Sequence, residues 1–213
     1  MQELIYLSVI NLAHRTDRKQ QCIIEIEKTG AIWEPHFFEA KYIQESGARG
    51  CALSHAMALS EFLFKSEKPF AMIMEDDFSL SSPGEFESDI KKAIEYNEYW
   101  DVFLLGHNLA IPIKQSKWPA HFKVINSQTT PGYIVSRKYA SELIKVFFKS
   151  AELLLVNELL PAPHRDIAKH FYCCDILWKE LQIKDNFLTT FPSVVCQRES
   201  YSDIERAVVN YGV

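Results

Sequence analysis

The sequence FAMIMEDD at residues 70–77 joins five consecutive apolar residues to three acids that follow them directly. An apolar run of this length, without alternating polar residues, is typical of a strand buried on both faces of a parallel sheet. In open α/β sheets, ligands bind in the crevice beyond the carboxyl ends of the strands. The stretch therefore predicts the fold class and also the edge of the sheet at which a site would lie.

Strand and helix patterns alternate along the rest of the chain. The predicted elements are a strand at 4–10, a helix through 23–26 that ends near Gly30, a strand near 37–38, a helix at 51–66, a helix through 86–94, strands at 101–106, 122–126 and 133–136, and helices at 137–149, 153–160 and 175–181. This alternation predicts an α/β fold with a mostly parallel central sheet flanked by helices. With 213 residues and 47% hydrophobic composition, we expect one domain over residues 1–213.

The composition argues against several classes of protein. The net charge of −5 is spread over segments of mixed sign, unlike the basic stripe of a nucleic-acid-binding protein. The five cysteines include no C-x-x-C pair, which argues against a zinc knuckle and a disulfide framework. No signal peptide or membrane-spanning run is visible, and neither G-x-G-x-x-G nor a P-loop occurs. We therefore expect a cytoplasmic protein that does not bind nucleic acid.

The acidic triplet is the chemical centre of the sequence. Three neighbouring carboxylates repel one another, and a divalent cation such as Mg²⁺ or Mn²⁺ would neutralise them. If the extended geometry persists, Glu75 and Asp77 point to one side and Asp76 to the other. Glu75 and Asp77 are therefore the predicted metal ligands, with an acidic surface loop as the alternative.

A polar segment at residues 11–18 follows the first predicted strand and should lie at the same edge of the sheet. Arg15 and Arg18 carry forked donors that suit a phosphate, and Asn11 and Asp17 could hydrogen-bond a base or ribose. The alternative is a solvated helix start with Asp17 as an acid of the first turn.

Ser54 and His55 fall in the first turn of the helix predicted at 51–66. Backbone N–H groups at a helix N-terminus favour anions, so these two residues are candidates for contact with a diphosphate or ribose. Ordinary capping and packing is the competing interpretation.

Three segments together resemble glycosyltransferase family 25, which contains lipopolysaccharide and lipooligosaccharide galactosyltransferases and the related collagen galactosyltransferases. They are residues 9–12 with the Arg15, Asp17 and Arg18 that follow, then 50–55, and then 70–77 with the acidic metal motif. Weaker similarity follows at 100–106, at 132–136 and at Asp175. The chain departs from the family in the segment between Ala40 and Gly50 and at Thr130-Pro131-Gly132.

The resemblance implies a GT-A type nucleotide-sugar-binding fold and an inverting transfer of a hexose. The implied donor is a UDP-sugar, UDP-galactose first. The implied acceptor is an oligosaccharide or lipid-linked glycan, such as a lipopolysaccharide or lipooligosaccharide core. Asp76 is expected at the donor site with the residues of the first segment, because it belongs to the family's acidic motif.

An inverting transfer also needs a general base for the acceptor hydroxyl. Asp175 is the first candidate and Asp101 the second, with a helix-start acid as the alternative role for Asp175. The basic and apolar segment 137–160 predicts either contact with the inner face of an anionic membrane or core packing. Two other functions stay open, a non-catalytic nucleotide- or glycan-binding relative and a metal-dependent phosphoester hydrolase.

Overall fold

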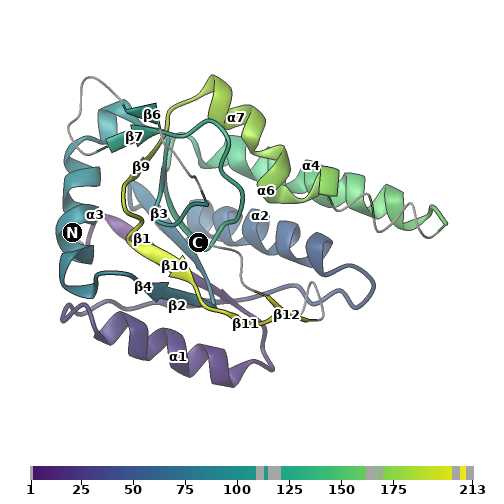
Figure 1. The fold of residues 1–213 in the computed structure, drawn as a ribbon, viewed down its shortest axis with the longest axis horizontal. Helices are drawn as coiled ribbons and strands as arrows, with labels where there is room; N and C mark the ends of the chain where they lie inside the picture. Colours follow the sequence, from purple (N-terminus) through teal and green to yellow (C-terminus); the bar gives the residue numbers. More distant parts are fainter. Residues whose placement is uncertain are drawn as a thin grey trace.

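The computed structural model describes residues 2–108, 113–114, 121–161, 167, 170–202 and 207–209, and its centre is an eight-stranded sheet (Figure 1). The strands of this sheet, in spatial order, are β2 (His36–Glu39), β1 (Ile5–Asn11), β3 (Phe70–Glu75), β8 (Gly132–Ser136), β5 (Val102–Leu104), β9 (Phe187–Thr190), β7 (His121–Lys123) and β6 (Ile113–Lys114). Two small sheets pair β10 (Val195–Gln197) with β4 (Phe78–Leu80) and β11 (Ser200–Ser202) with β12 (Ala207–Val209).

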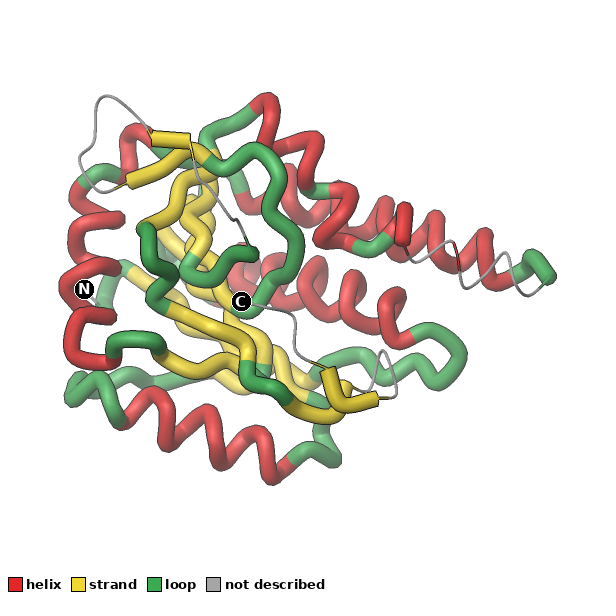
Figure 2. Tube along the Cα trace, in the orientation of Figure 1, coloured by secondary structure: helices red, strands yellow, loops and turns green. Residues whose placement is uncertain are grey.

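The helices lie on both sides of the sheet, in red around the yellow strands of Figure 2. They are α1 (Thr16–Glu27), α2 (Gly47–Lys65), α3 (Pro83–Glu95), the 3₁₀ turn η1 (Asn97–Tyr99), α4 (Ala140–Glu158), α6 (Cys174–Leu177) and α7 (Lys179–Lys184). Six of the eight described strands of the large sheet run in one direction, and β8 and β7 run against them. The predicted α/β class, with a mostly parallel sheet flanked by helices, is confirmed.

Strand β3 separates two hydrophobic cores because successive side chains of a strand point to opposite faces. Met72 and Met74 belong to the core that contains buried residues of α1 and α3, whereas Ala71 and Ile73 belong to the core with α2 and α4. Burial on both faces explains why residues 70–74 read as a continuous apolar run.

Helix α2 begins at Gly47, one turn earlier than predicted, because Ser46 caps it by accepting a hydrogen bond from the backbone N–H of Arg49. The predicted start at residue 51 was therefore wrong. The two helices predicted at 137–149 and 153–160 are one helix, α4, since the residues between them contain no helix breaker. The strand predicted at 122–126 is shorter, at His121–Lys123.

Helix α4 packs its first part against the core through Leu143, Phe147 and Ala151, as one of the two predictions for this segment had it. Towards its far end, which projects from the body in Figure 1, Leu155 and Leu159 are exposed. None of the helices in the described ranges is both long enough and apolar enough to cross a membrane.

Candidate functional site

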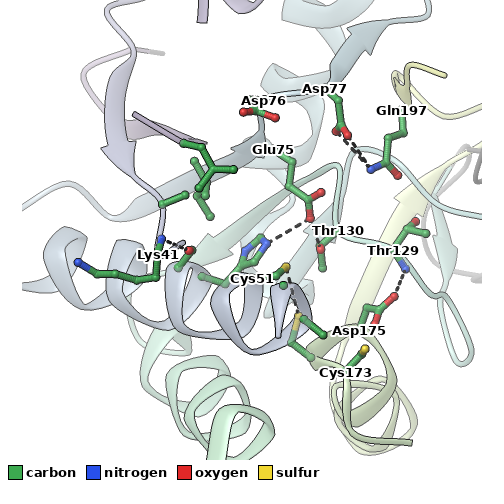
Figure 3. Close-up of a pocket in the computed structure, with 18 of the residues that line it drawn as sticks. Lys41, Cys51, Glu75, Asp76, Asp77, Thr129, Thr130, Cys173, Asp175 and Gln197 are labelled. Carbon is green, nitrogen blue, oxygen red and sulfur yellow. Dashed lines mark hydrogen bonds and ion pairs between the residues drawn. The ribbon is translucent and has the colours of Figure 1, made fainter. Parts of the chain in front are cut away.

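A cavity of about 560 Å³ opens where β1 and β3 end. Its walls come from the end of β1, residues 40–44, α2, the acidic triplet, residues 128–130, α6 and the end of β10 (Figure 3). The parallel register of the two strands sets Ile10 opposite Glu75, so the segments that follow them meet at this edge. The cavity therefore lies at the sheet edge predicted from the sequence, and Glu75, Asp76 and Asp77 all line it.

Asp76 is buried and held by residues of the 11–18 segment. Arg18 donates from Nη1 to Asp76 Oδ1 at 2.5 Å, and Asn11 donates from Nδ2 to Asp76 Oδ2 at 2.8 Å. Both oxygens of this carboxylate are therefore taken up by charge-assisted contacts within the protein. Asn11 is not among the lining residues, so its described role is to position Asp76.

Asp77 is 8% exposed, and its negative charge is less well balanced by neighbouring donors than that of Asp76. Gln197, from β10, donates its side-chain amide to both carboxylate oxygens at 3.2 Å, and Arg18 Nη1 lies 3.6 Å from Oδ2. Burial raises the pKa of Asp77 from 3.8 to about 7, and the negative charge of Glu75 adds to that rise while Arg18 opposes it. This carboxylate is the one in the triplet that a cation would stabilise most.

Glu75 is the last residue of β3 and turns towards the α2 wall. Its Oε1 lies 3.2 Å from His55 Nε2 and also accepts a short hydrogen bond from the Thr130 hydroxyl. Because the strand ends at Glu75, the alternation used to separate Asp76 from its neighbours does not continue through the triplet. All three acids reach the same cavity, which corrects the predicted opposite orientation of Asp76.

Ser54 and His55 lie in the third turn of α2 and not at its N-terminus, so the backbone N–H groups invoked for an anion are already used within the helix. Ser54 Oγ accepts from the backbone N–H of Lys41 at 2.8 Å and donates to the Gly50 carbonyl at 2.7 Å. A Cβ on Gly50 would lie 2.3 Å from the Lys41 carbonyl oxygen, so only glycine allows this approach. Ser54 and Gly50 therefore fix residues 40–44 against α2.

His55 is buried next to Glu75, and its Nδ1 lies 3.1 Å from the Tyr133 hydroxyl. Burial lowers the pKa of His55, but the hydrogen bonds with Cys51 and Glu75 outweigh that effect and raise it to about 10. The imidazole thus contributes positive charge beside Glu75.

Arg15 and Asp17 form an ion pair with each other at 3.1 Å, and Asp17 is 59% exposed through its side chain. The bond from Arg15 lowers the pKa of Asp17 to about 2. Neither residue lines the cavity, in contrast to the predicted contact with a base, ribose or phosphate. The solvated helix start, the alternative for this segment, describes them better.

Asp175 and Asp101 occupy very different places. Asp175 lines the cavity on α6 and accepts a 3.0 Å hydrogen bond from the backbone N–H of Thr129, and burial raises its pKa. Asp101 precedes β5 at the opposite end of the sheet, where its Oδ2 accepts from the backbone and side chain of Asn186 at 3.1 and 3.3 Å. Asp101 was therefore wrong as a base, since it joins the starts of β5 and β9 far from the cavity.

The sequence analysis missed several cavity residues because only the folded chain brings them close to the acidic triplet. Thr129 has φ +70°, which is rare for a β-branched residue and costs backbone strain of the kind that clusters at functional sites. Thr130 and Gln197 contact Glu75 and Asp77 from segments more than 50 residues away. The one sequence signal was Thr130-Pro131-Gly132, noted as a departure from family 25.

No protein-family model matches the chain, and no curated protein matches it significantly. Solved structures with a similar backbone fold include a STIV protein with TM-score 0.49 and 12% identity. The match covers 93% of this chain and 86% of that one. A mannose-1-phosphate geranyltransferase from Thermus thermophilus has TM-score 0.47, at 9% identity over 88% and 73%. A glycosyltransferase involved in glycosylation of the major capsid of PBCV-1 has TM-score 0.46, at 11% identity over 95% and 96%. At these scores and identities the similarity carries no argument about function.

Proposed function

We propose that this protein is a metal-dependent, inverting glycosyltransferase of the GT-A type that uses a nucleotide-sugar donor. The observation that carries the proposal is the crowding of Glu75, Asp76 and Asp77 in one cavity at the carboxyl ends of β1 and β3. A cavity of about 560 Å³ is within the usual range for small-molecule sites. The family 25 resemblance of the same segments supports this function independently of the cavity.

The donor set fits a hard divalent cation. Asp77 and Glu75 would hold Mn²⁺ or Mg²⁺, since Asp77 is opposed by two acids and its nearest cation, Arg18, is bound more closely to Asp76. The described hydrogen bonds of Glu75 fall on Oε1, and Oε2 receives none from the described residues. When bound, the ion would stabilise negative charge on the leaving diphosphate.

Asp175 is the proposed general base for the acceptor hydroxyl. It faces the cavity from α6, on the wall across from the triplet in Figure 3, and the Thr129 N–H orients one of its oxygens. A carboxylate with a raised pKa accepts a proton more readily near neutral pH. Asp76 is fixed by Asn11 and Arg18 and would keep in shape the acidic corner, by which we mean Glu75, Asp76 and Asp77.

The finer parts of the proposal rest on the family 25 resemblance. They are UDP-galactose as donor and a glycan acceptor such as a lipopolysaccharide or lipooligosaccharide core. Contact with a membrane that carries lipid-linked acceptors is a separate proposal, based on the basic and apolar segment 137–160. A non-catalytic nucleotide- or glycan-binding relative is the second candidate, and the strained Thr129 in the cavity fits both, since such strain occurs at active sites and at ligand clamps. A phosphoester hydrolase, which would need more metal ligands around Asp77, is the third.

A panel of UDP-sugars, assayed for hydrolysis and for transfer to glycan acceptors with Mn²⁺ or Mg²⁺, tests the proposal. We expect turnover of at least one UDP-sugar, and at least a 100-fold loss in Asp77→Asn, because a metal supplies several kcal/mol and about 1.4 kcal/mol is tenfold. Asp101→Asn is the matched control and should retain activity. Asp175→Asn should lower transfer by about 10²-fold or more while donor binding persists.

Two results would argue against the enzyme. Tight UDP binding by calorimetry with no transfer to any acceptor would favour the non-catalytic relative. Equal activity of the wild type and Asp77→Asn would remove the acidic corner from the chemistry.

A further inference from the structure

A second group of metal-ligating side chains lies on the α2 wall of the same cavity. Cys51 and His55 are four residues apart on α2 and so share one face of the helix, while Glu75 reaches them from the end of β3. The ligating atoms of the three side chains all lie within 4.8 Å of one another. Of these residues, the proposed transfer uses only Glu75.

Two distances at this group match the edges of a zinc tetrahedron. His55 Nε2 and Glu75 Oε1 are 3.2 Å apart, and tetrahedral ligands at zinc–nitrogen and zinc–oxygen bond lengths are about 3.4 Å apart. Cys51 Sγ and the Sγ of Cys174, on α6, are 3.9 Å apart, close to the roughly 3.8 Å between two zinc-bound thiolates. Three donors of zinc chemistry thus come together from α2 and β3, and the Cys174 thiol of α6 lies beside one of them, Cys51.

The type of donor selects the metal. Thiolate and imidazole ligands favour zinc, whereas Mg²⁺ and Mn²⁺ favour oxygen ligands such as those of the acidic corner. The other ring nitrogen of His55, Nδ1, lies 3.1 Å from the Tyr133 hydroxyl, the kind of outer contact that orients a ligating histidine. Cys51, Glu75 and Cys174 line the cavity, so an ion has a path to them.

We propose that Cys51, His55 and Glu75 bind a zinc ion, and that the Cys174 thiol, which lies beside Cys51 but outside the group of three, moves in as the fourth ligand. Binding releases a proton from each thiol that becomes a thiolate and the Nε2 proton of the His55 imidazolium, since a ligating histidine is neutral. The ion would join α2, β3 and α6 and so fix one wall of the cavity. The proposal does not depend on the transferase function, since it involves another metal and other donors and shares only Glu75 with it.

Cobalt substitution tests this site in the whole protein, kept reduced and first stripped of metal with a chelator. We expect one equivalent of Co²⁺ to give a thiolate-to-cobalt charge-transfer band and strong visible absorption of tetrahedral cobalt, both removed by one equivalent of Zn²⁺. Cys51→Ser should weaken zinc binding in a competition titration by more than about 100-fold, the upper end of losses from outer-shell changes. Cys174→Ser should reduce the charge-transfer intensity by half, as one of two thiolates is lost.

Cys196→Ser is the matched control, because Cys196 lies on β10 beside Ser79 and should leave the cobalt spectrum unchanged. Circular dichroism of Cys51→Ser checks that the variant is folded. A wild-type protein without the charge-transfer band, or a folded Cys51→Ser that keeps it, would overturn the site. Unchanged intensity in Cys174→Ser would remove Cys174 as a ligand. Asp77→Asn should keep the cobalt spectrum while losing transfer, so the two proposals fail separately.

Discussion

The two ends of the central sheet carry aspartates that look alike in the sequence but differ in their surroundings. At the carboxyl end of β3, Asp76 and Asp77 are buried together and share one guanidinium, that of Arg18. At the amino end of β5, Asp101 is partly exposed and accepts two hydrogen bonds from Asn186. The first end concentrates charge at a cost in stability, and the second uses its charge to hold two strand starts together. An acid next to a strand therefore indicates a site only at the carboxyl end, where the cavity lies.

The largest expected effect comes from removing Arg18, the arginine that forms ion pairs with both buried aspartates. Arg18→Met leaves Asp76 and Asp77 buried without their cation, and breaking a buried pair from one side costs about 3–5 kcal/mol. Urea denaturation should show this as a lower free energy of unfolding. Arg15→Met is the matched control, since the exposed pair of Arg15 with Asp17 should contribute less than about 1 kcal/mol. Equal losses in the two variants would mean that burial does not distinguish the pairs.

The pH dependence of stability sharpens the contrast. Asp77 has a pKa of about 7 in the folded protein against an ordinary 3.8, so the folded state binds its proton more tightly. Stability should therefore fall as the pH rises from about 4 to 7, because in that window the carboxyl is ionised in the unfolded chain but still protonated in the folded protein. In thermal melts with a chelator present, Asp77→Asn should fall less steeply than the wild type. Asp101→Asn should keep the wild-type slope, and a parallel course of the wild type and Asp77→Asn would contradict the prediction.

The smallest effect is expected at the other end of the sheet. Asp101→Ala removes the acceptor of the Asn186 N–H and should cost about 1 kcal/mol, since the bond is exposed to solvent. Asp101→Asn keeps a carbonyl oxygen for the same N–H and should cost less. Both free energies can be measured by denaturant unfolding. A loss as large as that of Arg18→Met would show that this end is also a buried charge network.

Local pattern was enough to predict the sheet edge. The continuous apolar run of β3 requires burial on both faces, and the acids that follow it must then lie at its carboxyl end. The same logic placed the 11–18 segment beside it, and Arg18 and Asn11 do contact Asp76. It failed for Ser54 and His55, because the cap at Ser46 set the start of α2 one turn earlier.

The sequence by itself determined the α/β class and the edge at which the acids gather, because hydrophobic periodicity and strand ends are properties of neighbouring residues. The tertiary structure alone decided which side chains meet there. Gln197 reaches Asp77, Thr130 reaches Glu75 and Cys174 reaches Cys51 across separations of 120, 55 and 123 residues. Such contacts depend on the order and register of strands and on how the helices pack, which no local periodicity records.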